Sequence, residues 1–513
     1  MKKNILYYTA IAGLVPSGVL CNTLDLKESE QTKPNIIYIL ADDLGYAELG
    51  CFGQEKIETP NIDQLAAEGM RFTNHYSGQA VSGPSRCSLF TGLHSGHAYI
   101  RGNDPVASRG DVWNYRAMVA DSTLEGQRPV PANTIMIPRK LKEAGYATAC
   151  IGKWGLVWPG SESTPNKMGF DFFYGYNCQR MAHTYYPPFL YRNESREYID
   201  NELVVPGTKL DEGADVLNEE NYRKFTQSEY TPDLMYHELL NFVEHSASEP
   251  FALFWTTPVP HVPLQAPERW VKYYVDKWGD EKPYLGEAGY YPCRYPHATY
   301  AAMISYWDEQ IGGLVRQLKE LGIYENTVII FTSDNGPTFN GGADSPYFDS
   351  AKPFKSEAGW GKANLREGGI RVPMIAVWPG HIESGVTSDL LSAFWDMMPT
   401  MCEIAGVDCP PTDGISMLPE MTGKTEQQKK HEFLYWEFPE SGGQRAVRMG
   451  EWKAFVGDIK KGNRNIELYN LTKDPREQQD VSSEHPDLVE KALNIFRSQH
   501  TEPVVEGFRM PVW

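Results

Sequence analysis

The chain has 513 residues, of which 41% are hydrophobic and 12% aromatic, which is enough apolar material for a large packed core. Charged residues make up an ordinary 22%, which excludes a disordered chain, and the length corresponds to as many as three domains. With 48 Lys and Arg against 67 Asp and Glu, the net charge is −19. This charge argues against a nucleic-acid partner, because binding one requires cations that neutralise phosphates.

The N-terminus has the pattern of a secretory signal peptide over residues 1–21. Two cations, Lys2 and Lys3, precede a short apolar stretch, and small residues follow near Cys21. The pattern predicts export, either to the periplasm or out of the cell. Lipoprotein anchoring through Cys21 is the less favoured alternative, because Leu20 is a poor residue before a lipidated cysteine. No later apolar run approaches the roughly 20 residues of a membrane span, so no membrane-spanning helix is expected.

Four apolar runs share one design, in which apolar residues predominate on both faces and polar residues follow the carboxyl end. They cover residues 35–40, 147–152, 251–257 and 327–332. Such runs are typical of strands buried on both faces of a parallel sheet. The periodic segments 60–69 and 304–321 predict helices between them. The fold class predicted is therefore α/β, with a large, mostly parallel sheet sandwiched by helices.

The pattern changes after about residue 390. Short alternating segments at 433–438, 445–456 and 465–471 predict antiparallel strands, and residues 486–497 predict a helix. We therefore expect a main domain over residues 34–390 and a smaller α+β subdomain with an antiparallel sheet over 391–513.

Two acidic pairs follow the first and last of the four apolar runs. Asp42 and Asp43 follow one run, and Asp334 and Asn335 follow the other. Ligands of such sheets bind beyond the carboxyl ends of the strands, so these side chains are expected to meet. Oxygen donors alone suit Ca²⁺ better than Mg²⁺, and the absence of His or Cys counts against zinc. Either pair alone is typical of an ordinary turn or cap; together they predict a calcium site.

The segment from Ser82 to Arg86 has the features of an anion site. Pro84 can start a helix, which places Ser82 at a helix N-terminus, where backbone N–H groups favour an anion. Arg86 returns one turn later on the same face.

The same segment, read on to Thr91-Gly92, matches the signature (C or S)-x-P-S-R-x-x-x-x-T-G of sulfatases. Other motifs of that family follow in the family's order. They are A-D-D-L-G-Y at 41–46, G-K-W at 152–154, P-H at 260–261, S-D-N-G at 333–336, G-K at 361–362, E-G-G-I-R-V-P at 367–373 and L-Y-N-L at 468–471. From about residue 34 to 500 the chain resembles a type I, formylglycine-dependent sulfatase of the alkaline phosphatase superfamily, of the serine type found among bacterial carbohydrate sulfatases.

The resemblance implies a role for each motif. Ser82 would be oxidised to formylglycine by a dedicated maturation enzyme, and would then act as the nucleophile and as a ligand of one Ca²⁺ per chain. Arg86, Lys153 and Lys362 would balance the sulfate charge. His261 would contact sulfate or protonate the leaving oxygen. The reaction implied is removal of O-sulfate from a sulfated carbohydrate.

The chain departs from the family pattern at one position. Most relatives have G-K-W-H, whereas Gly155 stands here in place of the histidine. His183, His94 and His97 are the candidates to replace it. His183 lies in A-H-T-Y-Y-P, a combination that resembles sulfatases of galacto-configured sugars, so we favour a sugar-binding role for it. The other candidate substrate contacts are His97, Arg101 and Asp344.

Two other functions remain open at this stage. One is a phosphomonoesterase or phosphodiesterase of the same superfamily, which would use an unmodified serine. The other is a glycan-binding homologue in which Ser82 is never converted. Within the sulfatase reading, terminal galactose or N-acetylgalactosamine of host or algal glycans is the expected substrate, with the sulfated hydroxyl, exo or endo action and oligomeric state all left open.

Overall fold

The centre of the protein is a ten-stranded sheet. The computed structural model describes residues 33–511, so the predicted signal peptide lies outside the described residues. The strand order is β11-β2-β10-β9-β1-β8-β4-β5-β6-β7. The strands are β1 (Asn35–Ala41), β2 (Met70–Phe72), β4 (Ala147–Lys153), β5 (Phe172–Tyr176), β6 (Phe189–Arg192), β7 (Ser195–Tyr198), β8 (Phe251–Thr256), β9 (Thr327–Ser333), β10 (Met374–Val377) and β11 (Val386–Ser388).

The five central strands, β9-β1-β8-β4-β5, are parallel to their neighbours. Every residue of β1, β8 and β9 is buried, as the continuous apolar runs require. Antiparallel pairs, β9 with β10 and β5 with β6, extend the sheet on both sides. The predicted large, mostly parallel sheet is therefore confirmed.

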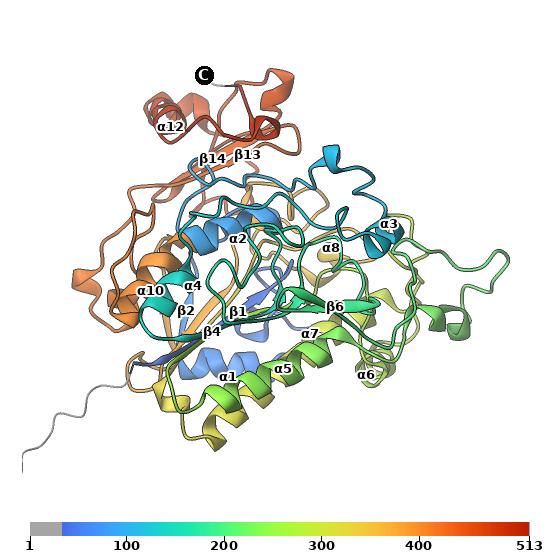
Figure 1. Ribbon diagram of the computed structural model, residues 1–513. Helices are drawn as coiled ribbons and strands as arrows, with labels where there is room; N and C mark the ends of the chain where they lie inside the picture. Colours follow the sequence, from blue (N-terminus) through green and yellow to red (C-terminus); the bar gives the residue numbers. More distant parts are fainter. Residues whose placement is uncertain (1–32, 512–513) are drawn as a thin grey trace, which may run out of the picture. The chain divides into compact units, whose positions relative to one another are not determined.

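Helices cover both faces of this sheet (Figure 1). On one face lie α1 (Pro60–Glu68), α5 (Thr231–Ser246) and α7 (Pro296–Glu320), and on the other α2 (Ser82–Thr91), α4 (Ile137–Glu143) and α10 (Met397–Ala405). Helix α7 begins eight residues before the predicted start at 304, because Pro296 suits a first helical position and small buried alanines continue the turn. Between residues 33 and 511, no helix has the length and apolar character needed to cross a membrane.

The C-terminal part forms a separate antiparallel sheet. Its strands, in order, are β13 (Leu434–Phe438), β14 (Gln444–Met449), β15 (Trp452–Val456) and β16 (Glu467–Asn470). The predicted strand region 445–456 folds as two strands around Gly450, whose φ of 57° suits a tight turn. Helix α12 (Pro486–Ser498) contacts β14. The predicted smaller antiparallel sheet with its helix is confirmed.

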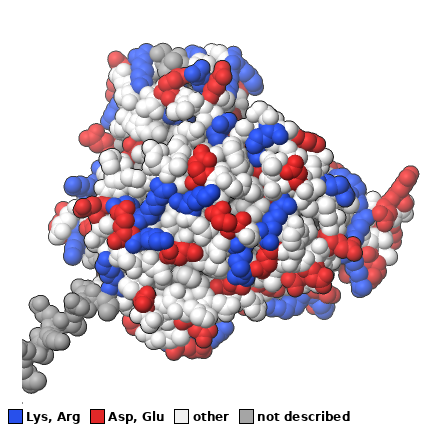
Figure 2. All heavy atoms as spheres, in the orientation of Figure 1, with Lys and Arg blue, Asp and Glu red and all other residues white. Residues whose placement is uncertain are grey.

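The surface charge is mixed. On the face seen in Figure 2, Lys and Arg are interspersed with Asp and Glu, and no broad region of that face is uniformly basic. A nucleic acid would need such a region, so this face offers it no continuous track.

Candidate active site

The acidic pairs meet at the carboxyl ends of β1 and β9. These two strands are in register up to Ala41 and Ser333, so the residues that follow them lie side by side. The backbone N–H of Asp43 donates to Oδ1 of Asp334 (3.1 Å), and Nδ2 of Asn335 donates to Oδ1 of Asp43 (2.7 Å). The structure therefore brings together the four oxygen-bearing side chains that the sequence pattern paired, and all four are buried.

Burial and mutual repulsion shift the titration of these carboxyl groups. Burial, with the neighbouring Asp42, raises the pKa of Asp334 to about 6. Burial also raises the pKa of Asp43, although Lys362 counteracts it. Burial acts in the same direction on Asp42, but Lys153 and other cationic side chains hold its pKa below the usual value. For Asp43 and Asp334, burial and the neighbouring carboxylates therefore outweigh the attraction of Lys362 and Arg86.

The donor set of this cluster fits a hard divalent cation. Oδ1 of Asn335 is buried and accepts no hydrogen bond among the described residues, whereas Oδ2 of Asp42 contacts the ammonium group of Lys153. Ligand atoms of Asp42, Asp43 and His261 all lie within 4.8 Å of one another. His261 is an addition, because no histidine was expected at the cluster. Three carboxylates and an amide oxygen remain the predominant donors, and they match the preference of Ca²⁺.

Ser82 is the first residue of α2, at the predicted helix N-terminus. Its Oγ donates to Oδ1 of Asp42 (3.1 Å), and Nζ of Lys153 donates to the same Oγ (3.3 Å). The side chain is buried. A nucleophile at this position would lie between an anionic ligand group and an ammonium group.

Three cations face the three carboxylates. Arg86 donates to Oδ2 of Asp334 (2.9 Å) from within the protein, where its side chain is fully buried. Lys153, the last residue of β4, forms an ion pair with Asp42. Lys362 pairs with Asp43 (2.7 Å) and has a side chain that is 21% exposed. It is therefore the cation of the three that an incoming anion can reach most readily.

His261 follows β8 and has a defined tautomer. Its Nδ1 lies 2.5 Å from the carbonyl oxygen of Val262, so Nδ1 carries the proton and donates. Nε2 then lies 3.7 Å from Oδ2 of Asp43. Burial, reinforced by Lys362, holds the pKa of His261 well below 6.5. The free imidazole is therefore neutral, and an anion bound nearby would favour its protonated form.

His183 lies against His261. Their ring centroids are 5.5 Å apart, and Tyr290 completes the group at 5.1 Å from His183 and 6.0 Å from His261. No sequence motif marks Tyr290, which lies in an irregular segment. These ring contacts do not test the sugar-binding role of His183, which stays a prediction.

Three predicted substrate contacts are engaged elsewhere. Nδ1 of His97 lies 2.9 Å from Asp413, and Arg101 donates to Glu437 and to Thr501. Asp344 caps the short helix α8 (Ser345–Phe348) and lies 3.1 Å from Nε2 of His297. Each charged group thus has a nearby partner, and no described contact joins any of them to the Ser82 cluster. Their role as substrate contacts stays a prediction.

The candidates to replace the missing histidine also make no described contact with Ser82. His94 stacks on His97, with ring centroids 4.2 Å apart, and its Nε2 lies 3.2 Å from Oε1 of Gln499. His183 stacks on His261 instead of approaching Ser82 through a described contact.

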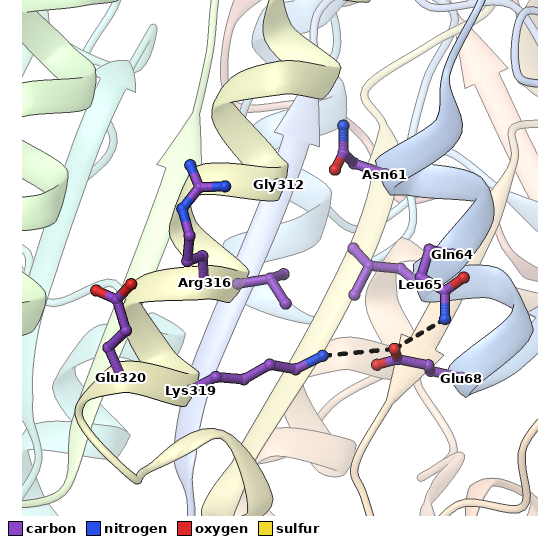
Figure 3. A pocket seen from close by; sticks show the side chains of 9 residues that line it. Asn61, Gln64, Leu65, Glu68, Gly312, Arg316, Lys319 and Glu320 are labelled. Carbon is purple, nitrogen blue, oxygen red and sulfur yellow. Dashed lines mark hydrogen bonds and ion pairs between the residues drawn. The ribbon is translucent and has the colours of Figure 1, made fainter.

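Two cavities differ in their relation to the site. One of about 310 Å³ has Lys362 in its wall, between the segments 337–340 and 357–363, and Phe339 is 45% exposed there. The other, of about 470 Å³, lies between α1 and α7, where Lys319 pairs with Glu68 (Figure 3). Only the first contains a residue of the cluster, so it is the opening next to the site.

The site combines a buried nucleophile position, an acidic oxygen cluster and three cations. This combination is typical of enzymes that hydrolyse charged esters. Residues 34–407 match the sulfatase family, and residues 356–496 match the family described as N-sulphoglucosamine sulphohydrolase, C-terminal. The chain belongs to the sulfatase family and is a sulfuric ester hydrolase.

Similar proteins agree with this assignment. N-acetylgalactosamine-6-sulfatase of Mus musculus is 30% identical over 439 residues, which is 82% of this chain and 72% of that protein. Arylsulfatase A of Homo sapiens is 27% identical, covering 92% of this chain and 89% of that protein. The crystal structure of Ps i-CgsB is 27% identical with a TM-score of 0.71, covering 92% of this chain and 94% of that one. The same TM-score holds for its complex with k-i-k-neocarrahexaose.

Proposed function

We propose that the enzyme removes O-sulfate from a carbohydrate, with Ser82, converted to formylglycine, as the nucleophile. The observation that carries this proposal is the position of the Ser82 Oγ, 3.1 Å from Asp42 and 3.3 Å from the Lys153 ammonium. A hydrated formylglycine would supply one oxygen that attacks sulfur. Its second oxygen would then form the carbonyl of the aldehyde, which breaks the bond from carbon to the first oxygen and releases sulfate.

The chain's own residues divide the work of holding charge. Asp42, Asp43, Asp334 and Asn335 would hold Ca²⁺, which would lower the pKa of an oxygen bound to it. Lys153 and Lys362 would face the sulfate oxygens, where their fixed charges stabilise negative charge that grows during the reaction. Arg86 holds Asp334 in place through its 2.9 Å ion pair.

His261 is suited to the leaving oxygen. Its Nδ1 is fixed by the carbonyl of Val262, so Nε2 is the atom available to a ligand. A sulfate ester bound beside it would supply negative charge, which raises the pKa of the imidazole and favours uptake of a proton at Nε2. That proton could then pass to the sugar oxygen as the S–O bond breaks.

The substrate we propose is a terminal galacto-configured sugar, galactose or N-acetylgalactosamine, from host or algal glycans. One relative is named an N-acetylgalactosamine-6-sulfatase, and one similar structure holds k-i-k-neocarrahexaose. His183 lies beside His261, with ring centroids 5.5 Å apart, and an imidazole can bond an axial hydroxyl.

We further propose that the chain is exported to the periplasm or outside the cell. The signal-peptide pattern of residues 1–21 supports export, and conversion of Ser82 would require a formylglycine-generating maturation enzyme as a partner.

The test combines mass spectrometry with a substrate screen. Protein from the native host is digested, and the peptide containing Ser82 is expected to weigh about two hydrogens less than its sequence predicts. The same protein is assayed on sulfated galactose, N-acetylgalactosamine and glucosamine, with the matching phosphate esters as comparison. An unconverted Ser82 with no turnover would favour the glycan-binding alternative. Faster hydrolysis of the phosphate esters would favour the phosphoesterase alternative.

A further inference from the structure

The space beside Gly155 is filled by a side chain from another segment. Gly155 has a φ of 86°, and a Cβ added to it would lie 2.5 Å from Nε2 and 3.2 Å from Oε1 of Gln179. These distances are too short for two unconnected groups to coexist without a shift. The amide of Gln179 therefore occupies the volume that any side chain at position 155 would enter.

The same amide lies next to the start of α2. A Cβ added at Gly83, the residue after Ser82, would lie 3.1 Å from Nε2 of Gln179. Oδ1 of Asn103 (2.6 Å) and Nε2 of Gln127 (3.2 Å) complete a ring of amide groups around this position. Gln179 thus spans the short gap between Gly155 and the turn of helix that presents Ser82.

Gln179 has an acceptor that no described group uses. Its Nε2 donates to the carbonyl oxygen of Gly155 (3.4 Å), which sets the orientation of the amide. Its Oε1 is buried and accepts no hydrogen bond within residues 33–511. Because a buried acceptor without a donor is unfavourable, a donor supplied by a ligand or by a modified neighbour would satisfy it.

We propose that Gln179 is a positioning residue that takes the place of the histidine missing at position 155, its Oε1 accepting a hydrogen bond from a hydroxyl of the hydrated residue 82. This inference rests on the proposed conversion of Ser82. A carboxamide does not titrate between pH 4 and 10, so Gln179 orients the hydroxyl without taking up its proton. The enzyme therefore works without an ionisable side chain at this position.

A matched pair of substitutions tests the hydrogen bond. Gln317 on α7 also has a buried Oε1 without a described partner, and its Nε2 donates to Leu240, so Gln317→Leu is the control. In preparations shown by mass spectrometry to be converted at residue 82, Gln179→Leu should lower kcat about tenfold or more with KM changed less than about twofold. Gln317→Leu should leave both unchanged. Wild-type kcat in fully converted Gln179→Leu would overturn the inference.

A second experiment needs no activity. Melting temperatures are measured for Gly155→His, for Gln179→Ala and for the double variant. We expect Gly155→His alone to melt well below the wild type, and the added Gln179→Ala to recover part of the loss, because it removes the colliding amide. Both histidine variants have the same backbone strain at position 155, where φ is 86°, so this strain cancels when the four proteins are compared. Strictly additive effects would show that the two positions do not share space, and would overturn the inference.

The pH profile gives a third readout. In the double variant, kcat should gain a titration near the pKa of imidazole, about 6.5, in addition to the titration that His261 gives the wild type. If the pH profile of kcat in the double variant matched that of the wild type, a histidine at position 155 would not be acting in place of Gln179. Failure of the proposed function is distinguishable, because it would appear as an unconverted or inactive wild type before any variant is compared.

Discussion

The Oγ of Ser82 lies 3.1 Å from Oδ1 of Asp42, although 40 residues separate them in the chain. Ser82 begins helix α2 on one face of the sheet, and Asp42 follows the central strand β1. Their contact connects the nucleophile position to the acidic cluster.

Ser82→Ala should abolish hydrolysis of every sulfate ester while the melting temperature changes little. The substitution removes the oxygen from which the nucleophile is made, but only two hydrogen bonds are lost, worth about 1 kcal/mol each. Turnover is measured beside circular dichroism, with Ser82→Cys as the control, because the family signature admits either residue. Turnover at the wild-type level in Ser82→Ala would show that another group attacks sulfur.

Lys362→Met should lower kcat/KM for sulfate esters by about 100-fold, the typical cost of losing one charged group that stabilises a transition state. Lys362 pairs with Asp43 at 2.7 Å, so the change also leaves Asp43 without its closest cation. The control is Lys319→Met, which removes an ion pair with Glu68 at 3.5 Å in the cavity between α1 and α7. Equal effects of both substitutions would contradict a role for Lys362 at the sulfate.

Removal of divalent cations should lower both activity and melting temperature, and Ca²⁺ should restore them better than Mg²⁺. A bound ion at 100 times its Kd stabilises the fold by about 2.7 kcal/mol. Differential scanning fluorimetry after chelation measures the shift directly. Asn335→Ala should reduce it, because Oδ1 of Asn335, which accepts no hydrogen bond from residues 33–511, would be a ligand of the ion. An unchanged melting temperature and full activity after exhaustive chelation would refute the ligand set.

Glu48 should make the protein less stable as the pH rises. Burial raises its pKa from 4.5 to about 7, while hydrogen bonds from Ser350 and Tyr300 limit the rise. Between these two values the folded state binds more protons than the unfolded state, so the free energy of unfolding falls with increasing pH and levels off above 7. The loss is at most about 3 kcal/mol.

Glu48→Gln should remove this dependence, because the amide is neutral throughout. Chemical denaturation of both proteins between pH 4.5 and 8 measures it, with Glu320→Gln on the exposed end of α7 as the control. Parallel stability curves for wild type and Glu48→Gln would show that Glu48 is ionised in the folded protein across this range.

Much of the fold was predictable because its signals are local. Continuous apolar runs predicted β1, β4, β8 and β9 to within one residue at each end. The short strands β2, β6 and β7, which lie at or next to the edges of the sheet, were missed, since three or four residues without a distinctive pattern are held in the sheet by their neighbours.

The site divides in the same way. The sequence alone determined which residues end the buried strands and begin α2, and hence that Asp42 and Asp334 share one edge of the sheet, because strand direction and helix caps follow from neighbouring residues. Only the family resemblance added Ser82 to this group. Only the tertiary structure decided that Arg101 pairs with Glu437, that Tyr290 joins His183, and that Gln179 fills the space beside Gly155. These choices depend on how loops from distant parts of the chain pack together, and that packing follows from volume and charge in three dimensions, which spacing along a chain does not encode.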